Sequence, residues 1–267
     1  MREGPMRVPW GLGEGAVKVS SKPILIYNLS DMQTSKAISA PISQIFSSLQ
    51  GEGPYLGERH LFVRFRDCNI HCTYCDEVGH PSEDLDISAL MERVKKIDAE
   101  QGPHHMVSLT GGEPLFYPQY LEVLIPALKK EGFQIYLETN GMLDKPLEKM
   151  LHWMDVIAMD IKLSSVTHER DILAQHAAFL KVARQKNIFA KMVVSRELEL
   201  SELEQALAMI QNVHPDLLVI LQPVTQGDHV DYATHDIGFL EGIQRFCLKY
   251  IKNVRVVPRL HKLVGIL

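Results

Sequence analysis

The sequence predicts an α/β protein built on a parallel sheet. Short apolar runs typical of buried strands alternate with amphipathic helical patterns at least five times along the chain. Such alternation indicates βαβ units, whose crossovers are right-handed. Polar or glycine-rich stretches follow directly after several of the strands, and active sites of parallel α/β folds lie at the carboxyl ends of strands. We therefore expect these stretches to meet at one edge of the sheet.

The elements follow from the spacing of the apolar residues, taken in chain order. The first two expected strands cover 42–46 and 60–65, and a helix over 85–99 has Asp86 or Ser88 available as its N-cap. The later apolar runs are too short for helices, and in the segments between them apolar residues recur at helical spacing. The remaining expected strands cover 106–109, 134–138, 155–161, 188–194, 217–221 and 254–257, and the remaining expected helices cover 120–130, 146–152, 168–185, 200–211 and 237–251.

The composition separates a short N-terminal stretch from the rest of the chain. Residues 1–40 are rich in Gly, Pro and Ser and lack periodicity, so we expect a poorly structured extension before a folded domain over 41–267. An edge strand at 24–27 is the alternative.

A net charge of −5 argues against nucleic-acid binding, and no apolar run approaches the ~20 residues that span a bilayer. The absence of a secretory apolar region and the unpaired thiols indicate a cytoplasmic protein.

Three of the four cysteines lie in one short stretch, 66–76, with the spacing C-x3-C-x2-C at Cys68, Cys72 and Cys75. Soft thiolates on one loop suit three corners of an iron–sulfur cluster and leave one iron open to a small molecule. A structural zinc site is the alternative, and it would need a fourth ligand such as His71 or Cys247. Cys247, however, has the helical spacing of a core thiol. A disulfide framework is the weakest reading, because the chain is long and poor in cysteine.

Two motifs together resemble those of the radical S-adenosylmethionine (SAM) superfamily. They are the cysteine loop, with Tyr74 before its last cysteine, and the sequence Thr-Gly-Gly-Glu-Pro over 110–114 after a strand. The resemblance implies a [4Fe-4S] cluster on the three cysteines, with the open iron chelating the amino and carboxylate groups of SAM. It also implies a partial (β/α)6-type barrel of parallel strands with crossover helices, so that 41–267 would be the catalytic domain.

A narrower resemblance, to the 7-carboxy-7-deazaguanine synthase family, runs from about residue 42 to 267. It is carried by 45–46, 50–53, Gly57, 62–64, 68–69, 75–76 and 260–262. That family converts 6-carboxy-5,6,7,8-tetrahydropterin to 7-carboxy-7-deazaguanine with loss of ammonia, by a radical ring contraction that serves queuosine biosynthesis and tRNA modification. No side-chain general base is implied, because the cluster and SAM carry the chemistry.

The resemblance also implies roles for individual residues. Arg64 would pair with the substrate carboxylate, and the C-terminal residues His261 and Leu267, the latter through its carboxylate, would close over the substrate. The implied substrate-binding residues are Leu49, Gln50, Gly51, Glu52, Arg64, Thr110, His261 and Leu267. The implied SAM-binding residues are Tyr74, Cys75, Asp76, Gly112, Glu113, Glu138, Lys162, Ser164 and Gln222.

One position departs from the family pattern. Glu77 stands where the family usually has threonine, whose hydroxyl helps to hold Mg²⁺ against the substrate carboxylate. A carboxylate is a good Mg²⁺ ligand, so the ion could persist; equally, the longer charged side chain could displace it. The family further implies a homodimer and a flavodoxin or ferredoxin reductant. Two alternative functions are a glycyl-radical-activating enzyme, or another enzyme of the superfamily, and a non-enzymatic iron–sulfur sensor.

Overall fold

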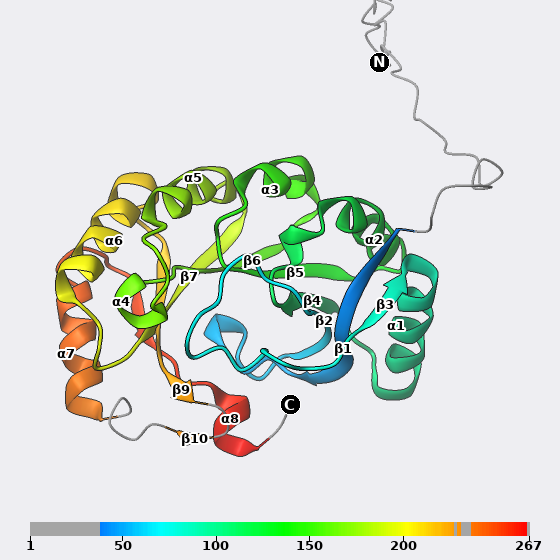
Figure 1. Ribbon diagram of the computed structural model, residues 1–267, viewed down its shortest axis with the longest axis horizontal. Coiled ribbons are helices and arrows are strands. Elements are labelled where there is room, and N and C mark those ends of the chain that lie inside the picture. The colour runs from blue at the N-terminus through cyan, green and yellow to red at the C-terminus, as the bar shows by residue number, and fades with distance from the viewer. Residues whose placement is uncertain (1–37, 227–228, 231–235, 266–267) are drawn as a thin grey trace, which may run out of the picture. The chain divides into compact units, whose positions relative to one another are not determined.

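The computed structural model describes residues 38–226, 229–230 and 236–265. One nine-stranded sheet carries helices between its strands, and a separate pair of short strands forms a second sheet (Figure 1). The strands of the large sheet are β1 (Ser39–Leu49), β2 (Arg59–Phe65), β3 (Glu83–Asp86), β4 (Met106–Gly111), β5 (Gln134–Thr139), β6 (Val156–Asp160), β7 (Asn187–Val194), β8 (Leu218–Pro223) and β11 (Val254–Val256), and the second sheet pairs β9 (Thr225–Gln226) with β10 (His229–Val230). The α-helices are α1 (Ile87–Gln101), α2 (Pro118–Lys130), α3 (Asp144–Met150), α4 (Ser164–Thr167), α5 (Leu173–Ala183), α6 (Leu200–Val213), α7 (Ile237–Cys247) and α8 (Leu260–Val264), and short 3-10 turns cover Gly53–Tyr55, Pro114–Phe116 and Leu151–Trp153.

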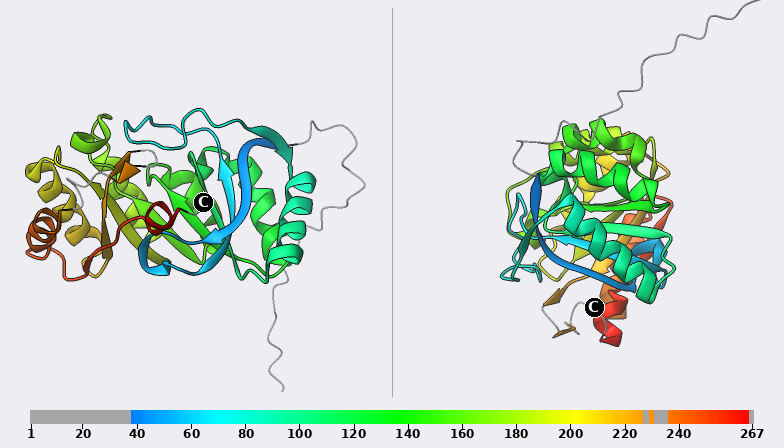
Figure 2. Two further views of the ribbon diagram at one scale, coloured as in Figure 1. Left: turned by 90° about the horizontal axis from the view of Figure 1, so that it is seen from below. Right: turned by 90° about the vertical axis from the view of Figure 1, so that its right-hand side faces the viewer.

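The sheet is parallel except at one edge. Its strand order is β11-β8-β7-β6-β5-β4-β2-β1-β3, and every neighbouring pair from β2 to β11 is parallel. Strand β1 instead pairs antiparallel with both β2 and β3. The sheet curves without closing on itself, because β11 and β3 remain as its two edges (Figures 1 and 2). The predicted partial barrel of parallel strands with crossover helices is therefore confirmed.

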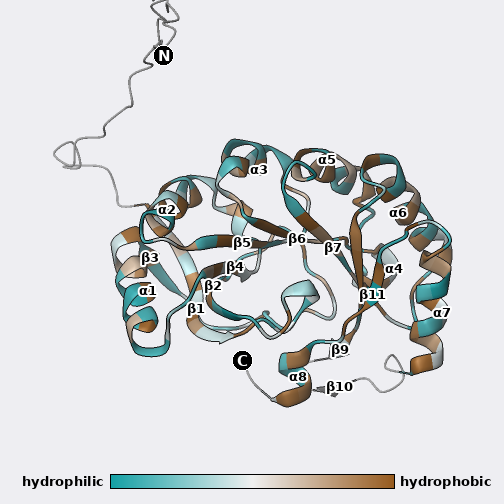
Figure 3. Cartoon of the chain, turned by 180° about the vertical axis from the view of Figure 1, so that it is seen from behind, coloured by the Kyte–Doolittle hydropathy of each residue, from teal (hydrophilic) through white to brown (hydrophobic). Residues whose placement is uncertain are grey.

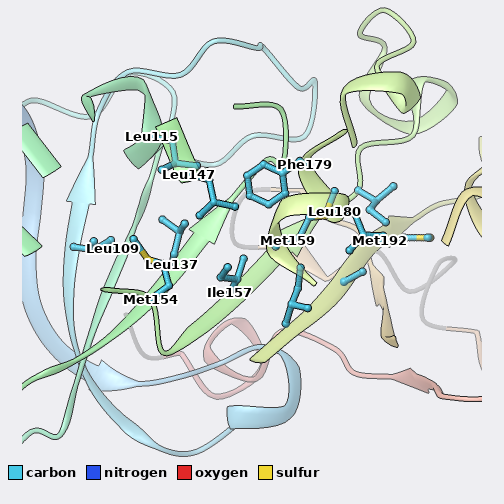
Figure 4. Close-up of a cluster of buried hydrophobic side chains, with 14 of the residues drawn as sticks. Leu109, Leu115, Leu137, Leu147, Met154, Ile157, Met159, Phe179, Leu180 and Met192 are labelled. Atoms are coloured by element: carbon cyan, nitrogen blue, oxygen red, sulfur yellow. The ribbon is translucent and has the colours of Figure 1, made fainter. Parts of the chain in front are cut away.

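Most of the core lies between the sheet and the helices on its convex face. Figure 3 shows mainly hydrophobic residues along several central strands and a mixture of hydrophilic and hydrophobic residues along the helices. Leu109, Leu137 and Ile157, from three successive strands, are fully buried and face Leu147 and Phe179 from the helices (Figure 4). Burying each such side chain stabilises the fold by about 2 kcal/mol before entropy is counted. The helices thus fix the strands whose carboxyl ends build the site.

The boundaries of several elements differ from those expected. Asp86 caps α1 as predicted, its carboxylate accepting from Ala89 N–H at 2.9 Å, but Leu85 belongs to β3. The helix expected from 168 begins at Leu173, because His168 has φ 58° and ends α4 in the left-handed region. Residues 260–264, to which the sequence analysis assigned no element, form α8.

Residues 1–37, and with them most of the expected extension and the possible strand at 24–27, lie outside the described residues. Strand β1 begins at Ser39, two residues before the expected domain boundary at 41. In the described part of the chain, no helix has the length and apolar character needed to cross a membrane.

Candidate active site

A cavity opens at the carboxyl ends of the parallel strands. It encloses about 1270 Å³ of empty space, a figure that includes the part open to solvent. Strands β2 and β4 to β7, the cysteine loop and the C-terminal segment all contribute to its wall. The predicted site residues that line it are Leu49, Gln50, Gly51, Glu52, Arg64, Cys68, Cys72, Tyr74, Cys75, Asp76, Glu77, Thr110, Gly112, Glu138, Lys162 and His261.

The cysteine loop brings Cys68, Cys72 and Cys75 to this cavity as free thiols. Cys75 N–H donates to the Cys72 carbonyl at 3.1 Å, and the Asn140 amide lies 3.6 Å from Cys68 Sγ. Burial raises the pKa of the Cys72 thiol to about 11, so a bound metal is needed to stabilise its thiolate. Three sulfur donors on one wall of a roomy cavity fit three corners of a [4Fe-4S] cluster.

The structure places neither candidate fourth zinc ligand at the cavity. His71 is exposed, and Cys247 is fully buried in α7. Within the described residues, no three His, Cys, Asp or Glu side chains are grouped tightly enough to hold a single metal ion. A closed zinc tetrahedron therefore has no support in this geometry.

The Gly-Gly-Glu segment joins β4 to the start of the cysteine loop. Gly112 N–H donates to the Phe65 carbonyl at 2.7 Å, and Glu113 N–H donates to the Asp67 carbonyl at 2.8 Å. Gly111 has φ +102°, and a Cβ there would lie 2.2 Å from the Phe65 carbonyl oxygen. The segment therefore needs glycine to approach β2 so closely.

Glu113 does not line the cavity. Its fully buried carboxylate accepts hydrogen bonds from Asn140 N–H at 2.7 Å, from Leu115 N–H at 3.0 Å and from the Thr139 hydroxyl at 2.9 Å. Burial raises its pKa to about 7. In this structure Glu113 ties the loop after β4 to the loop after β5, and its predicted contact with SAM stays a prediction.

Two carboxylates and two lysines form one side of the cavity. Lys162 Nζ lies 2.8 Å from Asp160 Oδ2, and Lys191 Nζ lies 3.5 Å from the same oxygen and also pairs with Glu52. Burial alone would lower the pKa of Lys162, but the charge of Asp160 outweighs it and the pKa lies well above its ordinary value. Lys162 is thus a fixed cation beside Cys72, able to face an anionic group of SAM.

Arg259 extends this network to the C-terminal segment. Its guanidinium lies 3.1 Å from Glu52 Oε1 and 2.9 Å from Asp76 Oδ2, and Lys262 reaches Asp76 at 3.3 Å. Although burial opposes ionisation, the charges of Lys191 and Arg259 hold the pKa of Glu52 well below its usual range. Sequence reasoning missed Asp160, Lys191 and Arg259, because a charge inside a strand or tail has no local signature.

The predicted substrate-binding residues gather around Glu138. Gln50 Nε2 donates to one Glu138 oxygen at 2.9 Å, and the Thr110 hydroxyl donates to the other at 2.8 Å. Burial raises the pKa of Glu138. Glu138, which the resemblance assigns to SAM, is therefore bonded here to two of the predicted substrate-binding residues. Aromatic rings to which the sequence analysis assigned no role in the site also line the cavity, namely Phe46, Phe62, Tyr136 and Phe189.

Two more predicted SAM-binding residues lie behind the cavity wall. Ser164 donates from its backbone N–H and its hydroxyl to Glu202. Gln222 is fully buried, and its amide nitrogen lies 3.3 Å from Glu52 Oε1. Leu267, expected to contact the substrate through its carboxylate, lies outside the described residues.

Glu77, for which both retention and displacement of magnesium were considered, forms an ion pair with Arg64 at 2.6 Å. The neighbouring carboxylate, Asp76, is taken by Arg259 and Lys262. A hard dication needs several oxygen ligands, and here the one available carboxylate already faces a guanidinium. The donor set around Glu77 therefore does not fit Mg²⁺.

A barrel of this kind, with three cysteines on the loop after its first parallel strand, defines a class of cluster-dependent enzymes. The sequence pattern of the Radical SAM superfamily matches residues 62–209, more than half of the chain. Among solved structures, QueE from Escherichia coli shares the fold, with TM-score 0.57 and 21% identity over 84% of this chain and 95% of that one. SuiB from Streptococcus suis, bound to SAM, has TM-score 0.53 and 16% identity over 72% of this chain and 48% of that one.

Sequence relatives identify one family within the radical SAM superfamily. The 7-carboxy-7-deazaguanine synthase of Geobacter sulfurreducens is 35% identical over 85% of this chain and 97% of its own length. The enzyme of the same name from Methanothermobacter thermautotrophicus is 32% identical over 85% of this chain and 98% of its own length. The chain belongs to the 7-carboxy-7-deazaguanine synthase family of the radical SAM superfamily.

Proposed function

We propose that this protein converts 6-carboxy-5,6,7,8-tetrahydropterin to 7-carboxy-7-deazaguanine with loss of ammonia, in queuosine or related deazapurine biosynthesis. One observation carries the proposal: the three cluster thiols and the polar residues expected to bind the pterin line a single cavity. When bound, the cluster and SAM supply a radical that abstracts hydrogen. The protein's own residues then bind, orient and shield the substrate.

The polar groups suit the two ends of such a substrate. The pterin ring presents adjacent amide and amine edges, and Gln50, Thr110 and Glu138 offer donors and acceptors side by side. At the other end of the substrate, the planar guanidinium of Arg64 lines the cavity and can donate hydrogen bonds to the substrate carboxylate. Helix α8 adds His261, whose ring packs on Gly51, so the cavity wall closes over a small ligand.

The proposed function also implies a cellular compartment, a reductant and an oligomeric state. We infer a cytoplasmic enzyme, since its cluster ligands are unpaired thiols. A flavodoxin or ferredoxin would serve as reductant, and the working form would be a homodimer. A glycyl-radical-activating enzyme would need an open face for a protein substrate, whereas this cavity is lined by a C-terminal helix.

The test is an anaerobic assay of the reconstituted protein with SAM, a reductant and the pterin. We expect the deazaguanine product in the wild type and none in Cys72→Ala. Because Gln50 is assigned to pterin binding, Gln50→Ala should raise KM for the pterin while leaving the cluster spectrum unchanged. An intact cluster without product would reject this substrate and leave the radical SAM class in place.

A further inference from the structure

We propose that the Glu77–Arg64 ion pair takes the place of a divalent cation at the carboxylate end of the substrate, so that this protein binds its substrate without magnesium. The inference rests on the proposed function. It concerns a residue that sets how the substrate carboxylate is held. Both side chains line the cavity and are mostly withdrawn from solvent, with 23% of Arg64 and 17% of Glu77 exposed.

Arg64 is held on three sides. Glu77 Oε1 lies 2.6 Å from its terminal nitrogen, and Gln44 Oε1 accepts from that same nitrogen at 3.1 Å. The ring of Phe46 lies 5.1 Å below the guanidinium and itself stacks on Phe62. A guanidinium fixed in this way cannot swing aside to leave Glu77 free for a metal ion.

Arg64 still has donors for a ligand. Its bonds to Glu77 and Gln44 both use one terminal nitrogen, Nη1. A guanidinium has five N–H donors, so the pair with Glu77 and Gln44 leaves part of its fork unused. A ligand carboxylate can therefore reach Arg64 while Glu77 stays bound to the other side.

The surrounding charges exclude a cation. The nearest alternative ligand, Asp76, is paired with Arg259 and Lys262, so a dication at Glu77 would have Arg64 as its closest neighbour and two more cations nearby. A threonine at position 77 would reverse this situation. Its short neutral side chain would free Arg64, open space for an ion and offer a hydroxyl oxygen as a ligand.

The experiment compares wild type, Glu77→Thr and a matched control, Glu92→Gln, which changes an exposed glutamate on α1. Pterin binding is measured by anaerobic calorimetry on the cluster-loaded, SAM-bound protein, in EDTA and in Mg²⁺. In parallel, Mn²⁺ is titrated and its free fraction followed by EPR. Neither readout depends on turnover.

We expect the wild type and Glu92→Gln to bind pterin equally in EDTA and in Mg²⁺, within twofold, and to leave Mn²⁺ free. Glu77→Thr should bind about tenfold more weakly in EDTA, recover in Mg²⁺, and retain one Mn²⁺ when pterin is present. Wild-type pterin binding that requires Mg²⁺, or stoichiometric Mn²⁺ uptake by the wild type, would overturn this inference alone. Failure of the pterin to bind in either buffer would overturn the proposed function and this inference with it.

Discussion

At the scale of single residues, the site depends on close approaches that only particular side chains permit. The Gly51 backbone accepts a hydrogen bond from Leu260 N–H at 2.9 Å, and the His261 ring lies against its α-carbon. A Cβ at residue 51 would stand 2.1 Å from His261 Nδ1, well inside contact distance. The glycine therefore sets how near α8 can come to the loop after β1.

Gly51→Ala should push His261 and α8 away from the cavity. We expect KM for the pterin to rise about tenfold, which corresponds to about 1.4 kcal/mol. Cluster content should not change, because the cysteine loop is not touched. Steady-state kinetics and the iron content would be measured together. The matched control is Gly242→Ala on α7, where nothing lies within 4 Å of the added atom and stability should rise by up to about 1 kcal/mol. Unchanged KM in Gly51→Ala would contradict this account of α8.

At the scale of elements, the C-terminal segment is joined to two distant loops by one side chain. Arg259 pairs with Glu52, which follows β1, and with Asp76, which ends the cysteine loop. All three side chains are largely buried, Arg259 to the extent that only 12% of it is exposed. Removing one member of such a network leaves the others as unpaired buried charges.

Arg259→Ala should therefore cost about 3 kcal/mol of stability and lower kcat/KM for the pterin by about 100-fold. The same truncation at Arg255, which is exposed on neighbouring β11, is the control and should change neither quantity appreciably. Urea unfolding and steady-state kinetics of the two variants would be compared with wild type. Equal effects in both variants would mean that Arg259 acts only as surface charge.

The elements also show what the sequence could and could not predict. The strands at 60–65, 106–109 and 134–138 were found because an apolar run of this length is a local signal. The sequence did not predict the antiparallel direction of β1, because strand pairing depends on residues distant in the chain. It also did not predict α8, because five residues carry too little periodicity. Likewise, the spacing of the three cysteines predicted their role from the sequence. The roles of Lys191 and Arg259 could be recognised only from their ion pairs with Glu52 in the folded structure.

At the scale of the whole molecule, stability depends on which buried groups must change protonation when the chain unfolds. Burial lowers the pKa of His176 to about 4, and that of His60 to about 4, below the ordinary value of 6.5. Between pH 6.5 and 4 the unfolded chain therefore binds more protons at these sites than the folded chain, so stability falls as the pH drops. Glu113 acts in the opposite sense: its folded pKa of about 7 makes the folded state hold an extra proton between pH 4.5 and 7.

Because the histidines and Glu113 change the stability in opposite directions as the pH falls, the contribution of a histidine has to be isolated by substitution. His176 Nε2 donates to the Asn140 carbonyl at 3.0 Å, and its Nδ1 is buried without a partner among the described residues, so a second proton there would have no acceptor. His176→Gln can keep a donor toward Asn140 without a titrating ring. Between pH 7.5 and 5.5, we expect wild type to lose about 1 kcal/mol more stability than His176→Gln.

The measurement is urea unfolding of the anaerobic protein at several pH values, followed by far-UV circular dichroism. His152→Gln, at an exposed position, is the control and should follow the wild-type pH profile. The difference between wild type and His176→Gln should grow as the pH falls through 6.5 and level off near pH 4, where the folded state begins to accept the proton. A difference that stays constant over this range would show that His176 contributes packing alone and that its protonation is not linked to folding.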